Sequence, residues 1–80
     1  MAYSITQVTP ETDFHLKLIY SDGVIRTVDF KPIIRQGGIF SFLNDPDFFK
    51  QVSLGDRGRY IEWPNEIDFC ADALRESSLI

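Results

Sequence analysis

Apolar and polar residues alternate in two neighbouring stretches of the chain, residues 14–20 and 24–30. The positions that alternate are apolar, with Arg26 as the exception: Phe14, Leu16, Leu18 and Tyr20, then Val24, Val28 and Phe30. A period of two is typical of a strand that buries one face and exposes the other. The two stretches therefore predict a β-hairpin.

The loop between the two strands sets their register. A two-residue loop would place Leu16 opposite Asp29, an apolar side chain against a polar one. A three-residue loop over residues 21–23 pairs Leu16 with Val28 instead, and cross-strand partners then share a face. We therefore expect the longer loop, with its glycine in the left-handed conformation. The same register places His15 opposite Asp29 on the outer face.

Proline and glycine divide the neighbouring segments into short elements. Residues 5–9 predict a short strand, which Pro10 ends. A helical turn over residues 33–36 has a proline at its start and two glycines just after its end, which are the usual places for these residues. A second short helix follows, with Asp45 as its cap and Pro46 at its first position.

A second hairpin and a last helix are expected in the final third of the chain. Residues 52–54 and 60–63 predict two strands joined by a glycine-containing turn, and Pro64 stops the second. Asp68 or Asp72 then caps a short helix.

Length and composition agree with one small globular domain over residues 1–80. The order of elements predicts an α+β fold, a small antiparallel sheet built from hairpins with two or three short helices. With 44% apolar and 14% aromatic residues, the chain is too apolar to be disordered. No apolar run approaches the roughly 18 residues of a membrane span.

The charge of the chain bears on its partners. Twelve acidic against eight basic residues give a formal net charge of -4, and only Arg57 and Arg59 of the basic residues lie close together. Direct binding to nucleic acid is therefore not expected, whereas docking on a basic protein is compatible with this charge. A single cysteine and the absence of a signal-peptide pattern indicate a cytoplasmic protein.

Two sets of polar residues are candidates for chemistry. His15 with Asp29 is the candidate acid–base pair, although no serine has the context of a nucleophile. The second set is acidic: Glu62, Glu66, Asp68 and Asp72. Asp68 and Asp72 would share a face of a helix and offer oxygen ligands to a hard cation, but the spacing matches no calcium loop. Surface pairing and helix capping are the simpler interpretations, so we expect no catalytic residue, metal or cofactor.

The remaining candidates are the cysteine and the aromatic residues. Cys70 lies between Phe69 and Ala71, which predicts a small buried residue. The chain has 7 Phe, 3 Tyr and 1 Trp, and any that stay exposed would mark an interface. We expect Phe40 and Phe48 in the core. The candidates for interaction are Trp63, Pro64, Phe42, Phe49, Asp68 and Asp72. A free sheet edge offers a second route, strand pairing across a two-fold axis.

Several motifs of this chain occur together in one known family. They are Phe14-x-Leu16-x-Leu18 with Asp22-Gly23, Val28-Asp29-Phe30 with Pro32, Gly38-Ile39-Phe40, Asp47-Phe48-Phe49, and Ile61-Glu62-Trp63-Pro64-Asn65 with Asp68 and Asp72. On these motifs, over about residues 5–75, the chain resembles the small bacterial proteins grouped as domain of unknown function 2442. It departs at Glu66, where the family usually has glycine, and at Arg75, where relatives often have tyrosine.

The resemblance implies a compact α+β domain and brings no established catalytic residues. Some relatives are joined to a helix-turn-helix domain, and others occur beside another small protein in arrangements suggestive of toxin–antitoxin pairs. We therefore expect a non-catalytic interaction module, either a homodimer or the acidic partner of another small protein, with an antitoxin-like or regulatory role. The alternative is a ligand-binding or metal-binding protein, or an enzyme, that uses His15 with Asp29 or the carboxylates from Glu62 to Asp72. That alternative requires a pocket.

Overall fold

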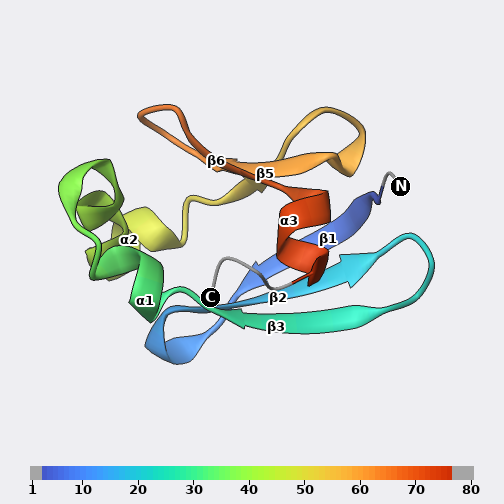
Figure 1. The fold of residues 1–80 in the computed structure, drawn as a ribbon, viewed down its shortest axis with the longest axis horizontal. Coiled ribbons are helices and arrows are strands. Elements are labelled where there is room, and N and C mark those ends of the chain that lie inside the picture. Colours follow the sequence, from blue (N-terminus) through green and yellow to red (C-terminus); the bar gives the residue numbers. More distant parts are fainter. Residues whose placement is uncertain (1–2, 77–80) are drawn as a thin grey trace.

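The computed structural model describes residues 3–76, and its first half forms a three-stranded antiparallel sheet (Figure 1). The strands β1 (Ile5–Pro10), β2 (His15–Tyr20) and β3 (Ile25–Asp29) lie in the order β1-β2-β3. Leu16 pairs with Val28, and Gly23 has φ 89°. The three-residue loop and its register are thus confirmed.

The second sheet contains β4 (Ser53–Leu54), β5 (Tyr60–Trp63) and β6 (Ile67–Cys70), again antiparallel and in sequence order. The first two are the predicted hairpin. β6 was not predicted, because its aspartate suggested a helix cap. Its residues alternate instead, with Ile67 buried and Asp68 exposed, so Asp68 lies in a strand and caps nothing. The fold is therefore α+β with two sheets.

Short helices complete the fold. α1 (Lys31–Ile34), the 3-10 helix η2 (Gly38–Asn44) and α2 (Pro46–Phe49) form a lobe at one end of the sheets (Figure 1). The predicted cap of α2 is confirmed, because the Asp47 N–H donates to Asp45 Oδ1 (3.0 Å). The last helix, α3 (Ala71–Glu76), begins after β6, so Asp72 lies within its first turn and is not its cap.

The core contains apolar side chains from both sheets. Phe30 is fully buried, and its ring lies within 6.0 Å of the rings of Phe49, Trp63 and Phe69. Two polar groups in the core find backbone acceptors: Trp63 Nε1 donates to the Phe49 carbonyl (2.8 Å) and Tyr20 Oη to the Ala71 carbonyl (2.9 Å). These bonds tie α2 to β5 and α3 to β2.

One glycine allows the two sheets to approach each other. Gly58 ends η3 (Asp56–Gly58), the 3-10 turn that precedes β5, with φ 70°. A Cβ atom at this position would lie 2.0 Å from the carbonyl oxygen of Ile5 in β1. Glycine therefore satisfies both the positive φ and the close contact at this position.

Within residues 3–76, no helix is long and apolar enough to cross a membrane.

Among the described strands, β3 pairs with β2 alone and so forms an edge of the first sheet. Arg26 lies opposite the fully buried Leu18, so its side chain is on the core face of this edge strand. Arg26 Nε is buried and has no hydrogen-bond partner among the described residues. A charge that points inward from an edge strand discourages pairing with another strand.

Candidate functional site

The connection between β1 and β2 has an unusual backbone. It contains the turn η1 (Thr12–Phe14), in which Asp13 has φ 61° and Phe14 has φ 60°. A bulky side chain in the left-handed region costs about 1–2 kcal/mol. Two neighbouring bonds hold the turn, Glu11 N–H to the His15 carbonyl (2.8 Å) and Phe30 N–H to the Phe14 carbonyl (2.9 Å). Strain of this kind is often found at functional sites.

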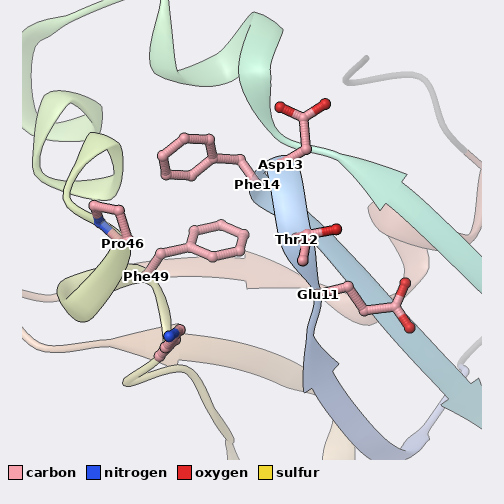
Figure 2. Close-up of a pocket in the computed structure, with 7 residues that line it drawn as sticks. Glu11, Thr12, Asp13, Phe14, Pro46 and Phe49 are labelled. Carbon is pink, nitrogen blue, oxygen red and sulfur yellow. The ribbon is translucent and has the colours of Figure 1, made fainter.

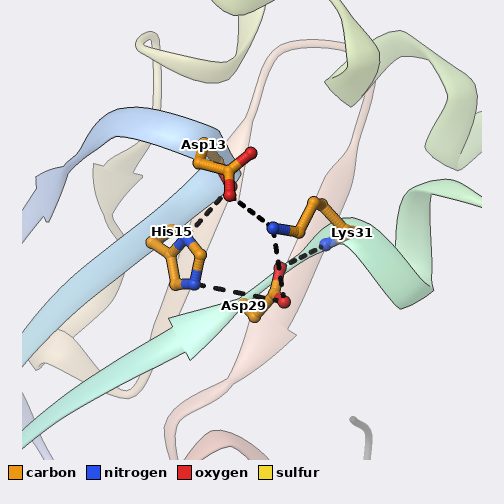
Figure 3. A network of polar contacts seen from close by, with 4 residues as sticks. All are labelled: Asp13, His15, Asp29 and Lys31. Carbon is orange, nitrogen blue, oxygen red and sulfur yellow. Dashed lines mark hydrogen bonds and ion pairs between the residues drawn. The ribbon is translucent and has the colours of Figure 1, made fainter.

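A polar network lies beside this turn and includes the predicted pair of His15 and Asp29 (Figure 3). Lys31 Nζ donates to a carboxylate oxygen of Asp13 and lies 3.8 Å from Asp29 Oδ2. The hydrogen bond from Lys31 holds the pKa of Asp13 below its usual value, and the same bond raises the pKa of Lys31. The one lysine therefore bridges two carboxylates.

The His15 ring is oriented by the backbone and not by a carboxylate. His15 Nδ1 donates to the Asp13 carbonyl oxygen (2.9 Å), since a carbonyl can only accept. His15 Nε2 lies 4.0 Å from Asp29 Oδ2, too far for a hydrogen bond. The two residues face each other as their register predicts, but the bond that would orient a catalytic imidazole is not made.

Two pockets flank η1. A pocket of about 260 Å³ is lined on one side by η1 and on the other by α2; its residues are Glu11, Thr12, Asp13, Phe14, Pro46, Phe49 and Lys50 (Figure 2). A second, of about 230 Å³, is lined by Asp13, Phe14, Lys31, Ile34, Arg35 and Asn44. Sequence reasoning missed both pockets. No residue pattern signals that Phe14 adopts a positive φ, and the pockets follow from that turn.

The acidic candidates do not form one cluster. Glu62 and Asp68 are cross-strand neighbours on the outer face of the second sheet. Asp72 Oδ1 instead accepts the N–H of Tyr3 (2.7 Å). The expectation that Asp68 and Asp72 share a helix face is wrong, because Asp68 is in β6. No group of three His, Cys, Asp or Glu side chains suited to a metal occurs in residues 3–76.

The aromatic candidates separate into core and surface. Trp63 and Phe49 are buried at 3% and 2% exposure, so neither is an exposed interface residue in this fold; Trp63 Nε1 bonds to the Phe49 carbonyl inside the core. Phe42 is 49% exposed, and Pro64 is exposed. Phe40 is half-buried and packs on the core, where its ring stacks on Phe69 (5.8 Å).

Cys70 is exposed, which corrects the prediction of a buried residue. The apolar neighbours on both sides suggested burial. In β6, however, side chains alternate between the faces, so Phe69 points toward the core and Cys70 toward solvent.

The segment of η2 and α2 has four exposed apolar and acidic residues, which together we call the η2–α2 face: Ile39, Phe42, Asp45 and Asp47. Ile39 and Phe42 are 48% and 49% exposed, and both aspartates are exposed. The segment from residue 36 to residue 49 contains no lysine, arginine or histidine. Arg35 and Lys50 flank this segment directly. Exposed apolar side chains beside charged ones are typical of a protein-binding surface.

The fold is that of a small α+β protein with two three-stranded antiparallel sheets. A comparison with protein families matches residues 5–78 to the family described as protein of unknown function (DUF2442). The chain belongs to this family, as the resemblance in its motifs indicated. No curated protein and no solved structure matches the chain.

Proposed function

We propose that this protein is a non-catalytic interaction module of the cytoplasm that binds a basic protein through the η2–α2 face. The observation that carries the proposal is the exposure of Ile39 and Phe42 in a segment that has acidic but no basic residues. Half-exposed aromatic side chains supply binding energy once a partner covers them. The carboxylates of Asp45 and Asp47 favour a basic partner and speed its encounter.

The polar network supports a non-catalytic role. Lys31 already engages both Asp13 and Asp29, and the backbone holds the ring of His15. None of these groups is a deeply buried charge of the kind that active sites use to shift reactivity. The network therefore has a sufficient structural explanation, since it holds the strained turn in place.

A different partner is favoured over self-pairing at the β3 edge. If two copies paired antiparallel about Thr27, Arg26 would face Val28 of the second copy on the inner side of the sheet. If they paired about Arg26, the two Arg26 side chains would face each other. In both arrangements the inner face of β3 offers no carboxylate to the buried Arg26 Nε. Burying this charge further without a partner is costly.

Within this proposal, the antitoxin-like or regulatory role is an analogy with relatives that occur beside another small protein. This analogy specifies the proposed partner as a small protein. A homodimer remains an outcome of the experiment below and would replace the basic partner.

The test is a pull-down of the tagged protein from its native cell, with the complex sized by light scattering and the partner identified by mass spectrometry. We expect a stoichiometric basic protein. F42S should weaken its binding at least about ten-fold, as for other interface hot spots. I25S is the matched control, because Ile25 is 58% exposed on β3 and away from this face. Equal losses for both variants, or a homodimer without a partner, would refute the proposal.

A further inference from the structure

We propose that the pocket between η1 and α2 receives one apolar side chain of the partner, next to a lysine or arginine of the same partner segment. This inference rests on the proposed function and locates the anchor of the interface. The pocket adjoins the η2–α2 face, because its wall residue Pro46 lies between Asp45 and Asp47.

Core side chains pack against the residues that form the walls of the pocket. The ring of Phe49 packs against those of Phe30 (6.0 Å) and Trp63 (5.9 Å), and its carbonyl accepts the indole N–H of Trp63. The ring of Phe14 meets Phe49 edge-on at 5.4 Å (Figure 2). The left-handed backbone of η1 places the Phe14 ring there, and Lys31 fixes this turn through Asp13. A pocket with fixed walls loses little conformational freedom when it is filled.

The size and lining of the pocket favour a side chain. At about 260 Å³, it is smaller than the 300–1,000 Å³ or so of typical small-molecule and cofactor sites. Figure 2 shows the ring of Phe14 directed from η1 toward α2 and the ring of Phe49 directed from α2 toward Thr12, while the carboxylates of Glu11 and Asp13 point away from the rings. The interior is therefore apolar and its margin is charged, which suits a leucine-sized or phenylalanine-sized anchor.

The charges around the two pockets select which one a basic segment uses. The pocket beside α2 has Glu11 and Asp13 at its margin against Lys50, and Asp45 and Asp47 lie next to it in the chain. The pocket on the other side of η1 shares Asp13, but it contains two basic residues, Lys31 and Arg35, so its lining has the opposite net charge. A basic segment is repelled there and attracted toward α2.

The pocket can be tested directly with a small probe. We would record amide NMR spectra of the full chain during titration with acetyl-Leu-Arg-amide. We expect the amide signals of Thr12, Phe14 and Lys50 to shift. Acetyl-Ala-Arg-amide should bind about ten-fold more weakly because it buries less apolar surface. Acetyl-Leu-Glu-amide should also bind more weakly than acetyl-Leu-Arg-amide. Absent shifts at these residues, or equal binding of the leucine and alanine probes, would overturn the inference.

A second experiment separates this inference from the proposed function. T12W places a large side chain into the pocket, and T27W, at an exposed position of β3, is its control; melting curves verify that both variants fold. We expect T12W to weaken capture of the partner at least about ten-fold and T27W to leave it unchanged. If F42S loses the partner but T12W keeps it, the pocket inference is wrong and the proposed function stands. If the probe binds but no partner is captured, the proposed function is wrong. The proposal that the pocket receives a side chain of a partner protein is then wrong as well.

Discussion

The two ends of this molecule are built differently. At the closed end, where α3 meets the β2–β3 loop, Arg75 donates to both carboxylate oxygens of Asp22 (3.3 and 3.0 Å). The Arg75 guanidinium also lies over the rings of Tyr3 (4.3 Å) and Tyr20 (4.9 Å). At the open end, η1 is strained, two pockets flank it, and the side chain of Phe42 is half exposed.

This difference separates stability from binding. The charged and aromatic groups around Arg75 satisfy one another at the closed end, although Val24 and Ile25 beside the same loop are 37% and 58% exposed. The open end keeps apolar surface and strained backbone that the rest of the fold must support. Proteins commonly accept such local costs where they bind other molecules, because the remaining core maintains the fold.

The largest expected effect compares one aromatic residue from each end. Tyr20 is 2% exposed and donates its hydroxyl hydrogen bond to Ala71, whereas Phe42 is 49% exposed. Y20A should lower the free energy of unfolding by about 3–5 kcal/mol. F42A should lower it by less than about 1 kcal/mol, although it removes a ring of similar size. Urea denaturation of both variants measures this, and similar losses would mean that the open end is part of the core.

The elements that sequence could predict are those governed by local rules. Alternation together with the three-residue loop gave the register of β2 and β3, because a one-residue slip would expose every apolar side chain. That register alone brought His15 opposite Asp29. The α2 cap followed from Asp45 and the proline after it.

The errors arose where tertiary packing decides the outcome. In β6, alternation covers only four residues, and the aspartate at its second position favoured a helix cap. The burial of Trp63 depends on α2, whose Phe49 carbonyl accepts the indole N–H. The pocket depends on a positive φ at Phe14, which phenylalanine rarely adopts and sequence does not signal.

A smaller effect is expected at a strained turn outside both ends. In the β5–β6 turn, Asn65 has φ 71° and Glu66 has φ 63°. Glycine would adopt this conformation at position 66 without strain. E66G relieves about 1–2 kcal/mol of left-handed strain. It also adds about 0.5–1 kcal/mol of conformational freedom to the unfolded chain, so the net stabilisation should be up to about 1.5 kcal/mol.

The matched control for E66G is N65G. Asparagine tolerates the left-handed region better than glutamate, so N65G should raise the denaturation midpoint less than E66G. A lower midpoint for E66G would show that the Glu66 side chain makes a contribution larger than the strain of its backbone.

The smallest expected effect compares one charged pair from each end under acid. Hydrogen bonds from Arg75 and from Lys31 lower the pKa values of Asp22 and Asp13, respectively, below 3.8. Because these pKa values are lower in the folded state, both pairs stabilise the protein above pH 3.8. Their contribution is lost as the pH falls through the folded-state pKa.

The two neutral variants should therefore differ. Within residues 3–76, D22N removes the ion-pair partner of Arg75, whereas after D13N the ammonium of Lys31 still lies 3.8 Å from Asp29. D22N should therefore remove more of the acid dependence of unfolding than D13N, measured by urea denaturation between about pH 6 and pH 3. The reverse order would place the stronger electrostatic contribution at η1, and the open end would then owe its strained geometry chiefly to Lys31.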